Sequence, residues 1–310
     1  MQSLQRFWLR AVRVLGIIIL IVWMLSSPAL AASSQNSGGT TQGLRQGVAA
    51  FQDGNYAEAA SFFSQVIEQK PDHAVAYGNR CLSYLELKRY ENAIADCTMA
   101  IELASDSTVA FVSEAFLNRG LAHYRSRQIQ NAIADYTQVL QQNVHDYRAL
   151  YNRGLAYADF GHYDEALQDY HQAVQQTPIP KEALTLIRND EGIAYLMLDK
   201  PMDAIAAFNQ AIQLNTSDIR AFFNRGCAYH RIGKEPLALH DFNQVIALDP
   251  THAQAYLHRG LIQIHMGQTE DAIASLTDAA QQFRAQDNLG AYERTQQLIH
   301  QLQFPSGAFG

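Results

Sequence analysis

The sequence predicts an all-α solenoid of about seven stacked helical hairpins, followed by one capping helix. When the chain is written in lines of 34 residues, the lines align from Thr40 almost to the end. One aligned column then contains alanine seven times without exception. A fixed period of this length is typical of repeat proteins, in which each hairpin buries its apolar face against the next. The sequence therefore predicts paired helices stacked in a row.

The first 31 residues have the layout of a secretory signal peptide. Arg6, Arg10 and Arg13 precede an apolar run over 14–25, and Ala29-Leu30-Ala31 has the small-x-small pattern of a cleavage site. The run is too short for a membrane-spanning helix, which needs roughly 20 apolar residues. We expect a protein exported to the periplasm or another extracytoplasmic compartment. An uncleaved N-terminal anchor in the membrane is the alternative.

The net charge and composition of the chain exclude some kinds of binding partner. Residues 32–39 are rich in Ser and Gly and are expected to form a flexible linker. The 310 residues have a formal net charge of −7, and without the three arginines of the first 31 residues the charge is −10. A chain this acidic is a poor candidate for a phosphate backbone, so we expect no nucleic-acid partner. Membrane association is expected only through an uncleaved N-terminal segment or through a partner.

Each predicted repeat contains two helical stretches joined by a short turn. The repeats are placed at 40–73, 74–107, 113–146, 147–180, 185–218, 219–252 and 253–286. The alanine column consists of Ala59, Ala93, Ala132, Ala166, Ala204, Ala238 and Ala272. A second column contains glycine in six of seven repeats, with Cys81 as the exception, and a third is mostly Phe or Tyr. Small residues let two helices approach closely, and a bulky side chain fills the space beside them.

The repeat frame shifts twice, and the chain ends in a further amphipathic stretch. Five residues are added around 106–110 and four around 181–184, each about one helical turn, so a longer helix is expected at both places. Residues 287–303 are predicted to form a capping helix that covers the last apolar face. Its apolar stripe is expected to consist of Leu289, Tyr292, Leu298 and Leu302. Residues 304–310 are expected to be a frayed tail.

Repeat six carries the motif residues Phe222, Gly226, Tyr229, Ala238, Phe242 and Pro250. This pattern resembles the tetratricopeptide repeat. The resemblance implies a right-handed superhelical solenoid whose concave groove is lined mainly by the first helix of each repeat. Members of this family commonly serve as protein-interaction scaffolds. Some bind C-terminal carboxylates through a Lys/Asn clamp, but Gly78, Leu82, Leu117 and Leu121 stand at those places here.

The resemblance therefore implies a non-enzymatic scaffold that holds a peptide segment of a partner protein in its groove. Such an adaptor would assist the assembly of an envelope or membrane-associated complex. The residues expected to contact the partner are Tyr124, Arg125, Arg148, Tyr151, Arg220, Phe223, His230 and Arg231. The alternative is a self-assembling structural solenoid without a groove ligand. Many apolar residues of the groove could also pack between adjacent repeats instead.

An arginine column and an aspartate column appear and disappear together. The pairs, sixteen residues apart, are Arg80 and Asp96, Arg119 and Asp135, Arg153 and Asp169, and Arg225 and Asp241. Repeat five has Glu191 and Ala207 at these positions and so lacks both partners. We interpret the pairs as structural ion pairs between the two helices of a hairpin. Contact of these arginines with a ligand is the alternative.

The sequence contains no pattern typical of catalysis or of a metal site. Cys81 and Cys97 point into one hairpin core, where they either form a disulfide in an oxidising compartment or remain two buried thiols. His230, His258 and His265 are predicted on neighbouring first helices, without a carboxylate or Cys at ligand spacing. Phosphate-binding glycine loops and HExxH or GxSxG motifs are absent from the sequence. We expect no enzymatic activity, no metal and no cofactor.

Overall fold

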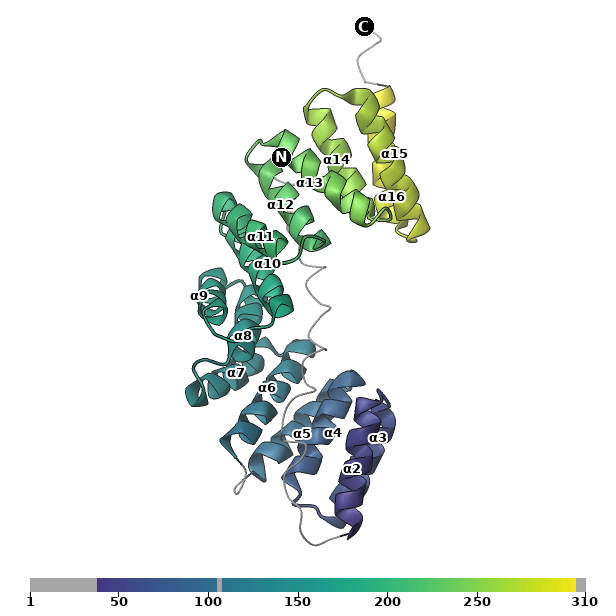
Figure 1. Ribbon diagram of the computed structural model, residues 1–310. Helices are drawn as coiled ribbons and strands as arrows, with labels where there is room; N and C mark the ends of the chain where they lie inside the picture. The colour runs from purple at the N-terminus through teal and green to yellow at the C-terminus, as the bar shows by residue number, and fades with distance from the viewer. Residues whose placement is uncertain (1–37, 105–107, 305–310) are drawn as a thin grey trace. The chain divides into compact units, whose positions relative to one another are not determined.

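The computed structural model describes residues 38–104 and 108–304, and these residues form helices and no strand (Figure 1). The predicted all-α architecture of consecutive helix pairs is confirmed. The helices are α2 (Gly38–Gln52), α3 (Tyr56–Gln69), α4 (Ala74–Glu86), α5 (Tyr90–Glu102), α6 (Val109–Arg125), α7 (Ile129–Gln142), α8 (Tyr147–Phe160), α9 (Tyr163–Val174), α10 (Lys181–Met197), α11 (Pro201–Leu214), α12 (Ile219–Arg231), α13 (Glu235–Leu248), α14 (Ala253–His265), α15 (Thr269–Ala285) and α16 (Leu289–Gln303).

The predicted signal peptide lies outside the described residues, as does the tail after Phe304. The predicted linker lies outside them except for its last two residues, which already belong to α2. None of the described helices combines the length and the apolar character that crossing a membrane requires.

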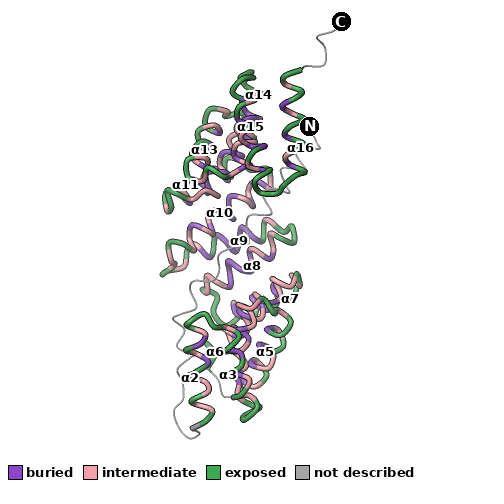
Figure 2. Tube along the Cα trace, turned by 90° about the vertical axis from the view of Figure 1, so that its right-hand side faces the viewer, coloured by how far each residue is buried: buried purple, intermediate pink, exposed green. Residues whose placement is uncertain are grey.

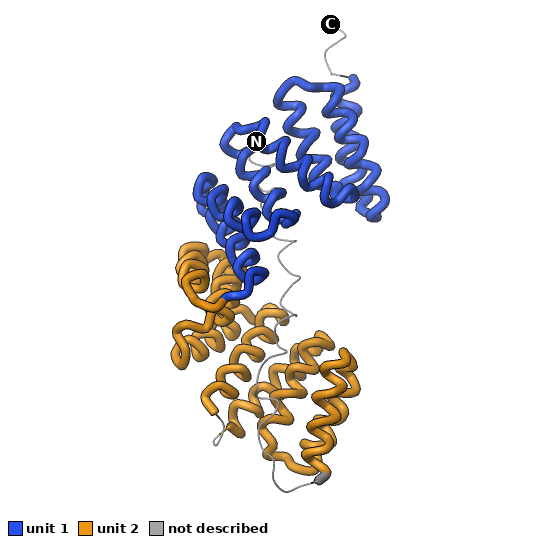
Figure 3. The backbone as a smooth tube through the Cα atoms, in the orientation of Figure 1, with its two compact units in different colours: residues 1–16, 179–310 blue, residues 17–178 orange. Residues whose placement is uncertain are grey.

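The chain divides into two compact units (Figure 3). The amino-terminal unit contains α2–α9, and the carboxy-terminal unit contains α10–α16. Within each unit, a helix packs against the next one along the chain, and the buried residues lie on the facing sides of the helices (Figure 2). We call the earlier helix of each pair the first helix and the later one the second helix.

Small residues bring the two helices of each pair together. All seven alanines of the repeated column are fully buried, at 0% exposure. A methyl group added at Gly154 would lie 2.6 Å from the ring of Tyr170, and one added at Gly120 would lie 2.7 Å from the ring of Tyr136. Such distances are shorter than a van der Waals contact, so a residue larger than glycine would push the helices apart.

The two predicted longer helices are confirmed. Both α6 and α10 contain 17 residues, whereas the first helices α4 and α12 contain 13 each. The residues added to the repeat frame therefore extend the start of a first helix by about one turn.

The turn between the two helices of a pair always contains one residue with a left-handed backbone. Gly54, Gly161, Gly233 and Gly267 take this position in four pairs, with φ from 68° to 89°. Lys88, Arg127 and Asp199 take it in the other three, with φ from 57° to 67°. Because glycine adopts this conformation at no steric cost, the three other residues hold a less favourable backbone.

The capping helix α16 packs against α15, and of its predicted stripe Tyr292 packs against the core while Leu298 and Leu302 are half-buried. Ala291, Thr295 and Ile299 are buried, whereas Leu289 is 56% exposed. Leu289 is the first residue of the helix, directly after the capping residue Asn288, and it lies outside the contact. Two of the three buried residues are small, as the close approach of two helices requires.

Candidate functional site

The first helices of the amino-terminal unit form one continuous face. Helix α4 contacts α2 and α6, and α6 contacts α8, whereas second helices approach one another less closely. The row of first helices is therefore the inner side of this unit. We call it the inner face.

Three first helices present the same pattern on the inner face. Each carries an asparagine, a leucine three residues later and a charged residue seven residues later, a spacing that places all three on one side of a helix. The residues are Asn79, Leu82 and Glu86 on α4, Asn118, Leu121 and Arg125 on α6, and Asn152, Leu155 and Asp159 on α8.

The three asparagines have incomplete hydrogen bonding. Asn79, Asn118 and Asn152, which we call the asparagine row, are only 5–8% exposed. The side-chain Nδ2 of Asn79 and the Oδ1 atoms of Asn118 and Asn152 have no hydrogen-bond partner. A buried polar atom without a partner costs about 1–3 kcal/mol, so the fold retains these three asparagines at an energetic cost.

The charged residues of the inner face interact with one another. Burial raises the pKa of the Glu86 carboxyl group, and the charge of Arg125 opposes that rise. The hydroxyl of Tyr124 donates a hydrogen bond of 2.8 Å to Asp159 on the next first helix. The inner face thus combines half-buried leucines with charges of both signs.

The arginines predicted to contact a partner are engaged inside the fold. Arg148 donates to Asp146 at 2.8 Å and to Glu114 at 2.6 Å, across two first helices. Burial lowers the pKa of Arg148, but the hydrogen bonds to the two carboxylates outweigh it and raise the pKa above its usual value. A partner would have to compete for donors that already bind carboxylates.

The same holds for the predicted arginines of the carboxy-terminal unit. Arg220 donates to Asp190 at 2.9 Å. Arg231 donates to the main-chain oxygen of Leu196 at 2.9 Å and pairs with Asp199 at 2.9 Å. These contacts join α12 to α10 or to the turn after it.

Two other predicted contact residues are buried, which corrects the expectation that they line an open groove. Tyr151 is 6% exposed and Phe223 is 5% exposed. The ring of Tyr151 packs against Tyr170, and that of Phe223 packs against Phe242 in an edge-on arrangement. Both rings fill the space between the first and second helices, because large aromatic groups gain most from full burial there.

The structure brings together all four predicted arginine–aspartate pairs. Each arginine binds both carboxylate oxygens of its aspartate, as in Arg153 and Asp169 at 2.8 and 2.7 Å. The other three pairs are Arg80 with Asp96, Arg119 with Asp135 and Arg225 with Asp241. Two parallel hydrogen bonds fix both the distance and the rotation of one helix against the other.

A further contact links each of these arginines to the preceding helix pair. The third guanidinium nitrogen of Arg153 donates to Thr137, and that of Arg225 donates to Asn209. Arg80 reaches Ser64 and Arg119 reaches Thr98 in the same way. Each guanidinium thus joins three helices of two neighbouring pairs, so this arginine column sets the stacking of the pairs.

Sequence reasoning missed a carboxylate beside the histidines of the carboxy-terminal unit. Glu235, on the second helix α13, accepts a hydrogen bond of 2.7 Å from the Nδ1 atom of His230. Its other oxygen lies 3.9 Å from His265 Nδ1. The expectation that no carboxylate stands at ligand spacing is wrong, because it compared the first helices alone. The short distance in sequence between His230 and Glu235, five residues, could have indicated that the carboxylate lies near the histidine.

Cys81 and Cys97 form a disulfide between α4 and α5, with a Cα–Cα distance of 5.5 Å. Of the two open alternatives, the structure has the bonded one. Cys227 is a free and buried cysteine, and its burial raises the pKa of its thiol.

Paired helices with buried small residues and a polar row along one side define a helical-repeat protein. Five tetratricopeptide repeat profiles match the chain, over residues 43–73, 74–107, 117–178, 219–252 and 242–274. Together these matches cover more than half of the sequence. The chain belongs to the tetratricopeptide repeat family.

Curated relatives share short segments with this chain. One of 81 residues is 37% identical to the protein STIP1 homolog of Dictyostelium discoideum and covers 26% of this chain and 14% of that protein. A second segment, 53 residues long, is 47% identical to serine/threonine-protein phosphatase 5 of Homo sapiens and covers 17% of this chain and 11% of that protein. A third segment, 51 residues long, is 43% identical to Hsp70-Hsp90 organizing protein 3 of Arabidopsis thaliana and covers 16% of this chain and 9% of that protein. The chain thus matches only a small part of each relative.

Solved structures share the fold. A tetratricopeptide repeat protein from Parabacteroides merdae superposes with a TM-score of 0.62 at 18% identity, covering 84% of this chain and 100% of that one. YrrB, described as a repeat protein with an unusual peptide-binding site, gives a TM-score of 0.50 at 22% identity, covering 65% and 97%.

Proposed function

We propose that this protein is a non-enzymatic, exported scaffold that holds an extended segment of a partner protein on the inner face of its amino-terminal unit. In this role it assists the assembly of an envelope or membrane-associated complex. The observation that carries the proposal is the asparagine row, with its three unpaired amide atoms. A relative named for organizing Hsp70 and Hsp90 supports a role in holding other proteins.

The spacing of the row suits an extended main chain. Packed helices lie about 8–10 Å apart, and an extended chain advances about 3.3 Å per residue. Successive asparagines therefore meet main-chain groups about three residues apart. A side-chain amide carries both a donor and an acceptor, so each asparagine, after rotation of its side chain toward the inner face, could donate to a carbonyl oxygen or accept from an N–H group of such a chain.

The remaining inner-face residues supply side-chain selectivity. Leu82, Leu121 and Leu155 are half-buried and offer apolar contacts between the asparagines. The acidic residues Glu86 and Asp159 stand on either side of Arg125 in the order of the helices. Since the predicted arginines are engaged within the fold, main-chain hydrogen bonds and apolar contacts carry most of the recognition.

The disulfide supports the proposed export. Disulfides persist in oxidising compartments and are rare where thiols are kept reduced. Both sulfur atoms belong to residues of 0% exposure, so the bond is part of the core of its helix pair. Fractionation of cells, followed by alkylation and mass measurement of the protein, tests this: we expect an extracytoplasmic protein with one thiol. A cytoplasmic protein with three thiols would contradict the export.

Selection from a random peptide display library tests the binding role. Peptides selected on the full chain should bind the Leu121→Asp variant about tenfold or more weakly, because a charge replaces an apolar contact in the middle of the inner face. The matched control is Gln138→Asp, an exposed position on the second helix α7 of the same pair, which should bind unchanged. Equal binding by both variants, or selection of no peptide, would contradict the proposal.

Light scattering on the same sample tests the alternative of a self-assembling solenoid. The adaptor is expected to be monomeric over a wide range of concentrations. If the measured mass increases with protein concentration, and if this increase persists in every variant of the inner face, the result would favour self-assembly.

A further inference from the structure

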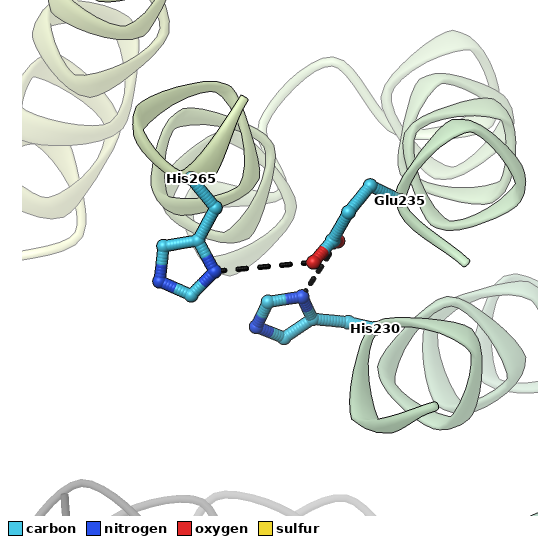
Figure 4. Close-up of side chains that lie close together, drawn as sticks. All are labelled: His230, Glu235 and His265. Atoms are coloured by element: carbon cyan, nitrogen blue, oxygen red, sulfur yellow. Dashed lines mark hydrogen bonds and ion pairs between the residues drawn. The ribbon is translucent and has the colours of Figure 1, made fainter. Parts of the chain in front are cut away.

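The ends of three helices in the carboxy-terminal unit bring two imidazoles and a carboxylate together (Figure 4). His230 lies in the last turn of α12, Glu235 is the first residue of α13, and His265 is the last residue of α14. Figure 4 shows both imidazole rings turned toward the Glu235 carboxylate. One ligand atom from each residue lies within 4.8 Å of the other two.

We propose that His230, Glu235 and His265 bind a divalent transition-metal ion of the Zn²⁺ class. Two imidazole nitrogens and one carboxylate oxygen are a ligand set that Zn²⁺ takes in proteins, with a fourth position left for water. Mg²⁺ and Ca²⁺ prefer six or more oxygen ligands and do not suit this set.

The geometry requires only a small closure. Ligand atoms at about 2.0–2.1 Å from a tetrahedral zinc ion lie roughly 3.3 Å from one another. His230 Nδ1 lies 2.7 Å from Glu235 Oε2, and these two atoms would have to move slightly apart. His265 Nδ1 lies 3.9 Å from the other oxygen, Oε1, and would have to move closer. The side chain of His265 is 60% exposed and has space to turn.

The surroundings favour a cation and hold two ligands in place. His230 and His265 both lie in the last turn of a helix, where the partial negative charge of the helix end stabilises positive charge. The His230 and Glu235 side chains are only 17% and 21% exposed, so their positions are set by packing. The nearby cation Arg231 is paired with Asp199. A bound ion would join the turn between α12 and α13 to the end of α14.

Zinc titration of the full chain, with no affinity tag and after treatment with a chelator, tests the proposal. Calorimetry should show one Zn²⁺ per chain, with no competition from excess Mg²⁺. His265→Ala and Glu235→Gln should each weaken binding by about 100-fold or more, since even supporting residues around a metal contribute about 10- to 100-fold. Circular dichroism checks that the variants keep their helices, which the exposure of His265 leads us to expect.

The control is His162→Ala in the amino-terminal unit. His162 lies 3.4 Å from Glu165, so this pair resembles the candidate site but contains one histidine and one carboxylate alone. The substitution should leave zinc binding unchanged. The proposal is overturned if the unaltered chain binds no zinc, if His265→Ala binds zinc as tightly as the unaltered chain, or if His162→Ala weakens binding equally.

Discussion

The disulfide between Cys81 and Cys97 occupies the place that a glycine and a facing bulky residue occupy in the other helix pairs. In the pair α8 and α9, these positions hold Gly154 and Tyr170, whose ring leaves no space for a side chain on the glycine. In α4 and α5, two small cysteines also allow the helices to approach closely, and their disulfide adds a covalent link between them.

Removal of this link should lower the stability of the amino-terminal unit. A disulfide that closes a loop of about 15 residues contributes roughly 3 kcal/mol by restricting the unfolded chain. Denaturant unfolding with and without a strong thiol reductant measures the effect. The Cys81→Ala, Cys97→Ala double variant should no longer respond to reductant, and Cys227→Ala should respond like the unaltered chain. An unaltered chain that is insensitive to reductant would contradict this prediction.

The pair of Arg153 and Asp169 should be strongly coupled. Asp169→Leu alone leaves a guanidinium without its carboxylate in a mostly buried position and should cost about 3–5 kcal/mol of unfolding free energy. Arg153→Met together with Asp169→Leu replaces both charges by apolar groups and should recover a large part of that loss. A double-mutant cycle measures the coupling. Strictly additive effects would show that the two side chains do not act as a unit.

Lys88→Gly should stabilise the turn between α4 and α5. Lys88 has φ of 57°, a left-handed backbone that costs an L-residue roughly 1–2 kcal/mol. Glycine relieves this cost but adds freedom to the unfolded chain, so we expect a net gain of about 0.5–1 kcal/mol. The reverse change, Gly161→Ala in the turn after α8, should destabilise by about 1 kcal/mol. Thermal unfolding of both variants measures whether each is more or less stable than the unaltered chain. A lower stability of Lys88→Gly would contradict the claim that its left-handed backbone is unfavourable.

His258 should make stability depend on pH. Burial is the main cause that lowers the pKa of its imidazole to about 3, and the charges of His230 and His252 contribute to the same shift. The unfolded chain binds this proton near pH 6.5, whereas the folded chain does not until about pH 3. Stability from this residue is therefore complete above pH 6.5 and falls as the pH decreases toward 3, by up to about 1.4 kcal/mol per pH unit.

The variant His258→Asn isolates this effect, because asparagine stands at the equivalent position in four other pairs, including Asn152 and Asn224. Unfolding midpoints between pH 3 and pH 7 should have a smaller slope in the variant than in the unaltered chain. Identical slopes would mean that other groups carry the pH dependence.

The sequence was most informative where one physical need recurs. Close helix packing demands the alanine column, and Arg153 and Asp169 illustrate a pair that recurs because each residue is costly to bury alone. Both features could be found by comparing the repeats with one another. The longer helices α6 and α10 followed from the same comparison.

Features that depend on one place in the structure could not be predicted in this way. Tyr151 and Phe223 lie at the border between the inner face and the helix interface, and only packing decides which side a large ring takes. Glu235 joins the histidines across a turn, from a helix that the repeat pattern assigns to the outer row. Leu289 is exposed because its helix begins there.

The most direct test of the binding role is an N-methyl scan of a selected peptide. Methylation of a main-chain nitrogen removes the N–H group that would donate a hydrogen bond to Asn118 or Asn152. The loss of one such hydrogen bond weakens binding by about threefold to tenfold. We expect two sensitive peptide positions about three residues apart, matching the distance between neighbouring first helices. The Asn118→Ala variant should make one of them insensitive. A peptide that tolerates methylation at every position, or whose sensitive positions are unaffected by Asn118→Ala, would contradict recognition of a main chain by the asparagine row.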